Sequence, residues 1–261
     1  GGDVVNLPLT RANGFFPDLE SLTADQRRRA KLLYLNYPNN PTGASASVAQ
    51  FQRAVDFCRK HQILIVSDAA YAALNFAGAP LSLLAVPGAK DVAVELHSMS
   101  KGFNMTGWRL GWVCGNELAV KAFAHVKDNA DSGQFAAIQK ASIAALDRCL
   151  EITPKICAKY SRRLDALVAT LRELGFQANK PQGSFYLYVD VPQATKSGVK
   201  FPTGEAFSQW LITDRLISTV PWDDAGHCVR FSATFVAKGE ADEARVLAEV
   251  RRRLRAVEFV F

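Results

Sequence analysis

The chain has 261 residues, of which 49% are hydrophobic and 21% charged, with 17 Gly and 11 Pro. This composition is typical of one large or two modest globular domains and excludes disordered and fibrous classes. The formal net charge is +6, but Lys and Arg are scattered, and the densest run is Arg251 to Arg253 in an expected C-terminal helix. We interpret that run as a solvated helix face and expect no nucleic-acid partner.

Cysteine usage and hydropathy indicate the compartment. The five cysteines form no CxxC pair, and the four histidines do not lie near them at zinc-site spacing. We therefore expect reduced, mostly buried thiols and no metal site. No apolar run reaches the roughly 18 residues that span a bilayer, and the opening GGDVVNLPLTRANG lacks the features of a signal peptide. These observations predict a cytoplasmic protein with no membrane partner.

Strand and helix patterns alternate through residues 1–150. Short apolar runs at 30–36, 62–68, 91–97 and 109–114 are typical of buried strands. Between the first two, residues 45–61 place Val48, Phe51, Val55 and Cys58 at intervals of three and four, which predicts a helix with one apolar stripe. Strands buried on both faces and joined through helices predict an α/β architecture with a largely parallel sheet.

Residues 151–261 are expected to form a second, smaller α+β domain. The pattern over 117–175 is almost wholly helical and ends at Gly175, a residue type that commonly follows a helix. After it come strand-like segments at 183–191, 217–222 and 228–235, with helices expected at 203–214 and 239–256. A long connecting helix therefore leads into the second domain.

Polar residues follow the ends of three expected strands. Asn40, Asp68 and the group from Ser98 to Lys101 each lie just past such an end. In open α/β sheets, ligands bind outside the carboxyl ends of the strands. We therefore expect these side chains to converge on one crevice.

Each of these residues also has an ordinary structural explanation, as a turn, a helix cap, a solvated loop residue or half of an ion pair. Their joint order suits an aldehyde cofactor with a pyridine ring, a phenolic oxygen and a phosphate. A lysine amine forms a Schiff base with the aldehyde. A fixed carboxylate keeps the ring nitrogen protonated, and hydroxyls with an arginine bind the phosphate.

The segments YPNNPTG, SDAAY, SMSKGFNMTGWRLGW and VRFSATF resemble the successive motifs of the class I/II aminotransferases, which are pyridoxal-phosphate (PLP) enzymes of fold type I. The resemblance extends over essentially the whole chain. It implies a PLP-transferase-like three-layer α/β/α large domain, here incomplete at its N-terminus and assigned to residues 1–150. The small C-terminal α+β domain is assigned to 151–261, including the connecting helix.

The resemblance implies a role for each matching catalytic residue. Lys101 would be the Schiff-base lysine and would carry the proton between the substrate Cα and C4′ of the cofactor. Asp68 would pair with the pyridinium nitrogen. Tyr71 would contact the phenolic oxygen.

The resemblance also implies the remaining binding residues. Asn40 would contact the phenolic oxygen and lie on the substrate side, while Ser98, Ser100 and Arg109 would bind the phosphate. Arg230 would bind the substrate α-carboxylate. An arginine inside an apolar strand needs an anion, and its planar fork matches a carboxylate, although an ion pair at the strand edge is the alternative.

Within the family, ELHSMSKGFNMTGWR, DNADSGQFAAIQKA and VPGAKDVAVE are most similar to LL-diaminopimelate aminotransferases of the bacterial type. This similarity implies a homodimer that acts on an L-amino acid, LL-diaminopimelate, and a 2-oxo acid such as 2-oxoglutarate. Alanine and aspartate aminotransferases carry related stretches, and a PLP-dependent lyase would use the same lysine and aspartate. These alternatives stay open.

Family members normally carry a sizeable portion before the position that matches Gly1. It holds a small-residue turn that grips the phosphate, an aromatic that stacks on the ring and an arm that closes over substrate. Without a helix-dipole anchor and a stacking partner, the cofactor is expected to bind weakly. A catalytically silent truncated homologue that associates with partner subunits is therefore a further alternative.

Overall fold

The structure, a computed structural model, describes residues 2–261. They form two compact units. The first contains residues 2–40 and 44–157, and the second contains Pro41–Gly43 and Ala158–Phe261. The long helix α7 (Cys149–Glu173) contributes to both units. The division at 150/151 that the sequence predicts stays a prediction.

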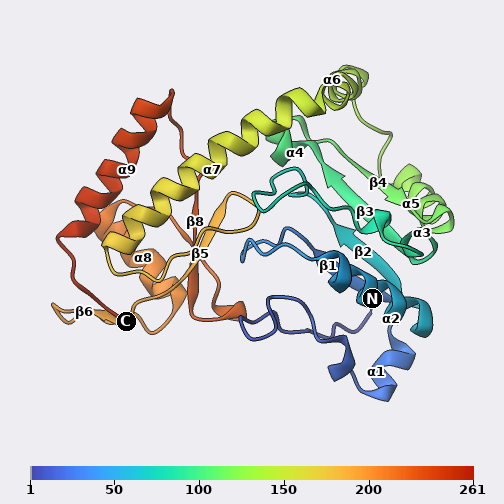
Figure 1. The fold of residues 1–261 in the computed structure, drawn as a ribbon, viewed down its shortest axis with the longest axis horizontal. Coiled ribbons are helices and arrows are strands. Elements are labelled where there is room, and N and C mark those ends of the chain that lie inside the picture. The colour runs from blue at the N-terminus through green and yellow to red at the C-terminus, as the bar shows by residue number, and fades with distance from the viewer. Residues whose placement is uncertain (1) are drawn as a thin grey trace. The chain divides into compact units, whose positions relative to one another are not determined.

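The first unit is built on a four-stranded sheet within the described residues, in the order β1-β2-β3-β4 (Figure 1). Its strands are β1 (Leu32–Asn36), β2 (Leu64–Asp68), β3 (Ala93–Ser98) and β4 (Gly111–Gly115). The pairs β1–β2 and β2–β3 are parallel, whereas β4 runs antiparallel to β3. The α/β class and the largely parallel sheet are therefore confirmed, and the carboxyl ends of β1, β2 and β3 share one edge of the sheet.

The helix predicted at 45–61 is α2 (Val48–His61). It begins at Ser47, whose hydroxyl accepts the N–H of Gln50 while the Gln50 side chain accepts the N–H of Ser47. Its buried face includes Phe51, Val55 and Cys58, as the spacing predicts. The other helices of this unit are α1 (Ala24–Arg29), α3 (Ala89–Val92), α4 (Met99–Gly102), α5 (Glu117–Ala130) and α6 (Ala136–Asp147), with the 3-10 helices η1 (Leu19–Ser21), η2 (Leu83–Ala85) and η3 (Thr106–Trp108).

The segment predicted as almost wholly helical, 117–175, divides into α5, α6 and α7. The break between α5 and α6 includes Asp131 and Gly133, and the Asp131 carboxylate accepts the N–H of Gly133 at 2.9 Å. Such local side-chain bonds compete with helical hydrogen bonds. Gly175 has a φ of +91° just past α7, as expected of a glycine that follows a helix. No helix among residues 2–261 combines the length and apolar character needed to cross a bilayer.

Burial differs from the sequence-based expectation at two places. Leu32 and Tyr34 of β1 are 50% and 68% exposed, whereas Leu35 on the other face is 4% exposed, so β1 is covered on one face instead of both. All five cysteines are thiols rather than disulfides; Cys58 and Cys228 are buried, and the other three are half-buried. Core burial, which the sequence predicts for most of the thiols, holds for two of the five, and their redox state stays a prediction.

The second unit is α+β, as predicted. Its antiparallel sheet has the order β5-β8-β7, and a separate pair joins β6 to β9. The strands are β5 (Tyr186–Asp190), β6 (Ala194–Thr195), β7 (Val220–Pro221), β8 (Cys228–Ser232) and β9 (Phe259–Val260), and the helices are α8 (Gly204–Arg215), η4 (Asp223–Ala225) and α9 (Glu240–Arg255). Phe176 packs against Phe207 and Phe231 in its core.

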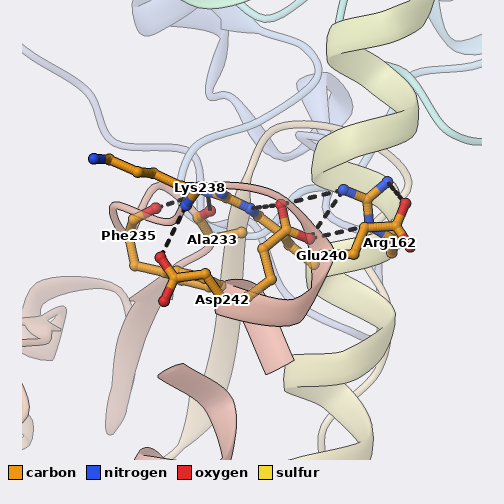
Figure 2. Close-up of polar contacts among 8 residues, drawn as sticks. Arg162, Ala233, Phe235, Lys238, Glu240 and Asp242 are labelled. Carbon is orange, nitrogen blue, oxygen red and sulfur yellow. Dashed lines mark hydrogen bonds and ion pairs between the residues drawn. The ribbon is translucent and has the colours of Figure 1, made fainter. Parts of the chain in front are cut away.

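A polar cluster ties α7 to α9 and to the segment that follows β8 (Figure 2). Arg162 contacts Glu240 at 3.2 Å and Glu243 at 3.0 Å. Arg163 bonds Glu243 at 2.8 Å and donates to the carbonyl oxygens of Ala233 and Phe235 at 3.1 and 2.7 Å. The backbone directly after β8, the strand that carries Arg230, is therefore held by a buried arginine.

Candidate functional site

Asp68 is the last residue of β2 and is exposed at the carboxyl edge of the first unit's sheet. Its Oδ1 accepts the N–H of Ala70 at 3.0 Å, which leaves the second carboxylate oxygen for a ligand. The register places Asp68 beside Asn36 on one side and Leu96 on the other. The structure thus puts the carboxylate where the sequence predicts it, at a strand end beside the ends of β1 and β3.

Asn36 connects two of the predicted site residues. Its side-chain amide donates to the carbonyl oxygen of Asp68 at 3.0 Å, and its Oδ1 accepts the backbone N–H of Asn40 at 2.8 Å. The loop that carries Asn40 is thereby fastened to the strand that carries Asp68. Sequence reasoning missed Asn36; the available signal was a lone amide at the end of an apolar strand, directly before the Pro- and Asn-rich loop.

Lys101 lies in α4, the single helical turn that follows β3. Its Nζ lies 5.7 Å from the centroid of the Tyr71 ring, and Tyr71 is buried with 6% exposure. Gly102, the next residue, lies so close to Ala73 that an added Cβ would come within 2.5 Å of the Ala73 Cβ. This close packing brings Lys101 and Tyr71 together, although they are thirty positions apart.

The three residues predicted to bind a phosphate lie on one short stretch. Ser98 is the N-cap of α4, and its hydroxyl accepts the N–H of Ser100 at 3.1 Å. The Thr106 hydroxyl donates to the carbonyl oxygen of Ser100 at 2.9 Å. The Arg109 guanidinium donates to the carbonyl oxygen of Thr106 at 2.8 Å. Thr106 therefore fixes the turn between the serines and Arg109. Sequence analysis did not single it out.

Arg230 lies in β8 of the second unit and is half-buried. Its guanidinium carbon lies 3.7 Å from the centroid of the Tyr186 ring and 5.8 Å from that of Trp222. Arginine stacks on aromatic faces in this way through cation–π attraction. The two rings hold a planar cation in a defined orientation, and its contact with a substrate carboxylate stays a prediction.

The side chains of the first unit match the groups of PLP one by one. A half-buried amine lies over a phenol ring at Lys101 and Tyr71, and a carboxylate ends the neighbouring strand at Asp68. Hydroxyls and a guanidinium follow on the stretch from Ser98 to Arg109. An amine, a carboxylate and phosphate-binding donors are the set that this cofactor requires. The residues present therefore fit PLP, and their individual roles stay predictions.

Comparison with known proteins supports the same chemistry. The family model described as aminotransferase class I and II matches residues 1–250. Two relatives named LL-diaminopimelate aminotransferase, from Methanococcus maripaludis and Methanocaldococcus jannaschii, are 55% and 54% identical to this chain. Each match covers 100% of this chain but 64% of the relative, so the chain spans about two thirds of the length of these proteins.

Solved structures agree with the fold. Substrate-bound BacF from Bacillus subtilis superposes with a TM-score of 0.88 at 34% identity, over 98% of this chain and 63% of BacF. Aspartate aminotransferase from Thermus thermophilus with maleate has a TM-score of 0.83 at 29% identity, over 97% of this chain and 65% of that enzyme. The resemblance found in the motifs is thus confirmed. The chain belongs to the aminotransferase class I and II family, whose members are PLP-dependent in general.

Proposed function

We propose that this chain carries the activity of a PLP-dependent aminotransferase that moves an amino group between LL-diaminopimelate and a 2-oxo acid such as 2-oxoglutarate. The observation that carries the proposal is the 55% and 54% identity, over 100% of this chain, with two proteins named LL-diaminopimelate aminotransferase. The placement of Lys101 over the Tyr71 ring, directly after a parallel strand, supports it independently. Both the reaction and the substrate are parts of the proposal, since the chain spans 64% of those relatives.

The catalytic part of the proposal assigns three residues. When bound, PLP supplies an electron sink for the bonds at the substrate Cα. The Lys101 amine would hold the cofactor and then carry the proton removed from the substrate. The Asp68 carboxylate would keep the ring nitrogen protonated, because an opposite charge favours the charged form of a base. Tyr71 would donate its hydroxyl to the phenolic oxygen of the cofactor.

The binding part of the proposal assigns the other predicted residues. Ser98 and Ser100 would donate hydroxyls to the phosphate, and Arg109 would add a charged bidentate donor. Asn40 would donate to the phenolic oxygen and border the substrate. Arg230, stacked on Tyr186, would bind the substrate α-carboxylate through its planar fork.

We include a homodimer and a cytoplasmic location in the proposal. Helices α5 and α6 expose apolar side chains that a subunit interface would cover, and these are Leu118, Phe123, Val126, Ile143 and Leu146. Exposed apolar groups in such numbers are typical of association surfaces. The five cysteines are thiols, as is usual in a reducing compartment.

Cofactor attachment is the first experiment. The chain is incubated with PLP, reduced with borohydride and digested, and the labelled peptide is mapped for the wild type and for Lys101→Ala. We expect the label on Lys101 and its loss in Lys101→Ala. Lys121→Ala is the matched control, since Lys121 is an exposed lysine of α5 paired with Glu117. A label distributed equally over surface lysines in all three proteins would contradict the proposal.

Substrate assays then separate the alternatives. We expect glutamate to form from 2-oxoglutarate with LL-diaminopimelate as amino donor, and much less with alanine or aspartate. A preference for alanine or aspartate would replace the substrate assignment but keep the reaction. Release of pyruvate and ammonia from an amino acid alone would indicate a lyase. Labelling of Lys101 without turnover of any donor would indicate a chain that binds PLP but is catalytically silent by itself.

A further inference from the structure

A second polar cluster, formed by Glu95, His97 and Cys114, lies on one face of the sheet where β3 pairs with β4. Glu95 lies directly opposite Cys114 in the register, and His97 lies opposite Trp112. Residues two apart on a strand point to the same side, and residues directly opposite on paired strands share a face. Two adjacent strands thus present a carboxylate, an imidazole and a thiol to one point.

The distances within this cluster are close to those of a metal site. The Oε2 of Glu95 lies 3.1 Å from the Nε2 of His97, and one ligating atom from each of the three residues lies within 4.8 Å of the others. Ligands bound to zinc at about 2.0 to 2.3 Å in tetrahedral geometry lie about 3.3 to 3.8 Å apart. Shifts of about an ångström in the ligating atoms, which side-chain rotation can supply, therefore suffice for all three to reach one ion.

Neighbouring groups hold the ligands in place. Glu95 is 2% exposed, and its carboxylate accepts the hydroxyl of Ser82 at 2.9 Å and the N–H of Leu83 at 2.6 Å. The His97 ring stacks on Trp112 with centroids 4.9 Å apart and planes inclined by 8°. In metal sites, the ligating carboxylate is itself hydrogen-bonded and the ligating imidazole is held in one orientation by its neighbours.

The Glu95–His97 pair by itself has a structural explanation, since Glu95 receives the N–H at the start of η2. That explanation leaves the thiol of Cys114 unaccounted for. A mixed set of oxygen, nitrogen and sulfur ligands favours zinc over calcium or magnesium, which prefer oxygen alone. His97 keeps 21% of its side chain exposed, so an ion can enter from solvent and retain a water as fourth ligand.

We propose that Glu95, His97 and Cys114 form a binding site for a zinc-class divalent cation, separate from the PLP site. On binding, the Cys114 thiol would lose its proton to solvent, His97 would bind through the neutral imidazole, and the carboxylate would complete a three-residue set. Because His97 directly precedes Ser98 at the end of β3, the ion would also brace the strand that leads to Lys101.

Cobalt, which reports thiolate ligands by a near-ultraviolet charge-transfer band, tests this proposal. The reduced chain without added PLP is titrated with Co²⁺ and then with Zn²⁺, for the wild type, Cys114→Ser, His97→Gln and the control Cys149→Ser, whose thiol lies on α7. We expect the band in the wild type and in Cys149→Ser, its loss in Cys114→Ser, and its displacement by Zn²⁺. We expect His97→Gln, which removes a ligand, to weaken Zn²⁺ binding by about a hundredfold or more. Ser82→Ala, titrated in the same series, removes a hydrogen bond to Glu95 and should weaken it by about tenfold.

Two results would overturn the proposal. One is the absence of any charge-transfer band in the wild type at saturating Co²⁺. The other is a band of equal strength in the wild type and in Cys114→Ser, which would place the ion on another thiol. Circular dichroism of each variant checks that it is folded. If Cys114→Ser does not fold, His97→Gln decides the question, because Zn²⁺ affinity equal to that of the wild type would overturn the proposal.

Discussion

Arg163 of α7 and Glu243 of α9 form a buried ion pair, with 2.8 Å between Nε of the arginine and Oε1 of the glutamate. Their exposures are 2% and 6%. Arg163 also donates to the carbonyl oxygens of Ala233 and Phe235 and lies over the Phe235 ring at 4.5 Å. A charge taken out of water is tolerated only when its partners are all in place. The pair is therefore a point at which the second unit is sensitive to substitution.

Arg163→Met should destabilise the second unit by about 3 kcal/mol, because the substitution leaves Glu243 paired with the solvent-exposed Arg162 and removes the buried donor of two backbone carbonyls. Arg252→Met is the control, since Arg252 pairs with Glu249 in solvent, where ion pairs contribute little to stability. Urea unfolding, followed by circular dichroism, measures both. Equal losses of unfolding free energy in the two variants would show that the buried pair stabilises the second unit no more than a surface pair does.

The same pair predicts how stability depends on pH. Burial raises the pKa of Glu243, but the hydrogen bonds and charges of Arg163 and Arg162 outweigh burial and hold the pKa below its usual value of 4.5. A carboxyl group whose pKa is lowered by folding contributes stability that is fully present above that usual value. The contribution is lost as the pH falls further, through the lowered pKa of the folded state.

Glu243→Gln should therefore be less stable than the wild type at pH 6 by an amount that shrinks as the pH is lowered below about 4.5. The glutamine cannot ionise, so its stability curve lacks the acidic loss that belongs to Glu243. The free energy of unfolding at a series of pH values from 6 to 3 tests this expectation. A wild-type-to-variant difference that stays constant over this range would refute it.

Sequence reasoning succeeded where one local pattern determines the structure. The strand ending at Asp68 and the helix over Val48–His61 follow from apolar spacing and adjacent polar stops. Features that depend on which strands pair could not be predicted from the sequence. The proximity of Glu95 to Cys114 arises because β4 returns antiparallel to β3, and no pattern in the eighteen intervening positions indicates it. The two bonds of Asn36 likewise require the loop and β2 to be in place, so the sequence offers only its position as an amide at the end of an apolar strand.

Asn36 gives a prediction for the cofactor site. Asn36→Leu removes the bonds to the Asp68 carbonyl oxygen and to the Asn40 N–H, so two proposed cofactor ligands lose their alignment. At about 1 kcal/mol for each lost bond, PLP affinity should fall by about tenfold or somewhat more. Titration with PLP by absorbance measures the change. Asn129→Leu on α5 is the control, since its amide donates to the carbonyl oxygen of His125 in the same helix. Unchanged affinity in Asn36→Leu would contradict the role of Asn36.

Gly43 closes the NNPTG turn with a φ of +70°, and an added Cβ would lie 2.2 Å from the Cβ of Pro181 and 3.0 Å from the carbonyl oxygen of Gly183. The Gly43 carbonyl oxygen also accepts the N–H of Gly183 at 2.9 Å. Gly43→Ala therefore combines a left-handed backbone, which costs about 1 to 2 kcal/mol, with a collision between backbone segments.

Gly198→Ala separates these two costs, because Gly198 lies in the same unit with a φ of +99° and an added Cβ would meet no atom of residues 2–261 within 4 Å. We expect Gly198→Ala to lower the free energy of unfolding by about 1 to 2 kcal/mol. Gly43→Ala should lower it by about 3 kcal/mol or more, since collisions with packed backbone are among the few changes that reach this size. Thermal unfolding of the two variants side by side tests the difference. If both melt at the same temperature, the packing of Gly43 against Pro181 contributes nothing beyond the backbone cost.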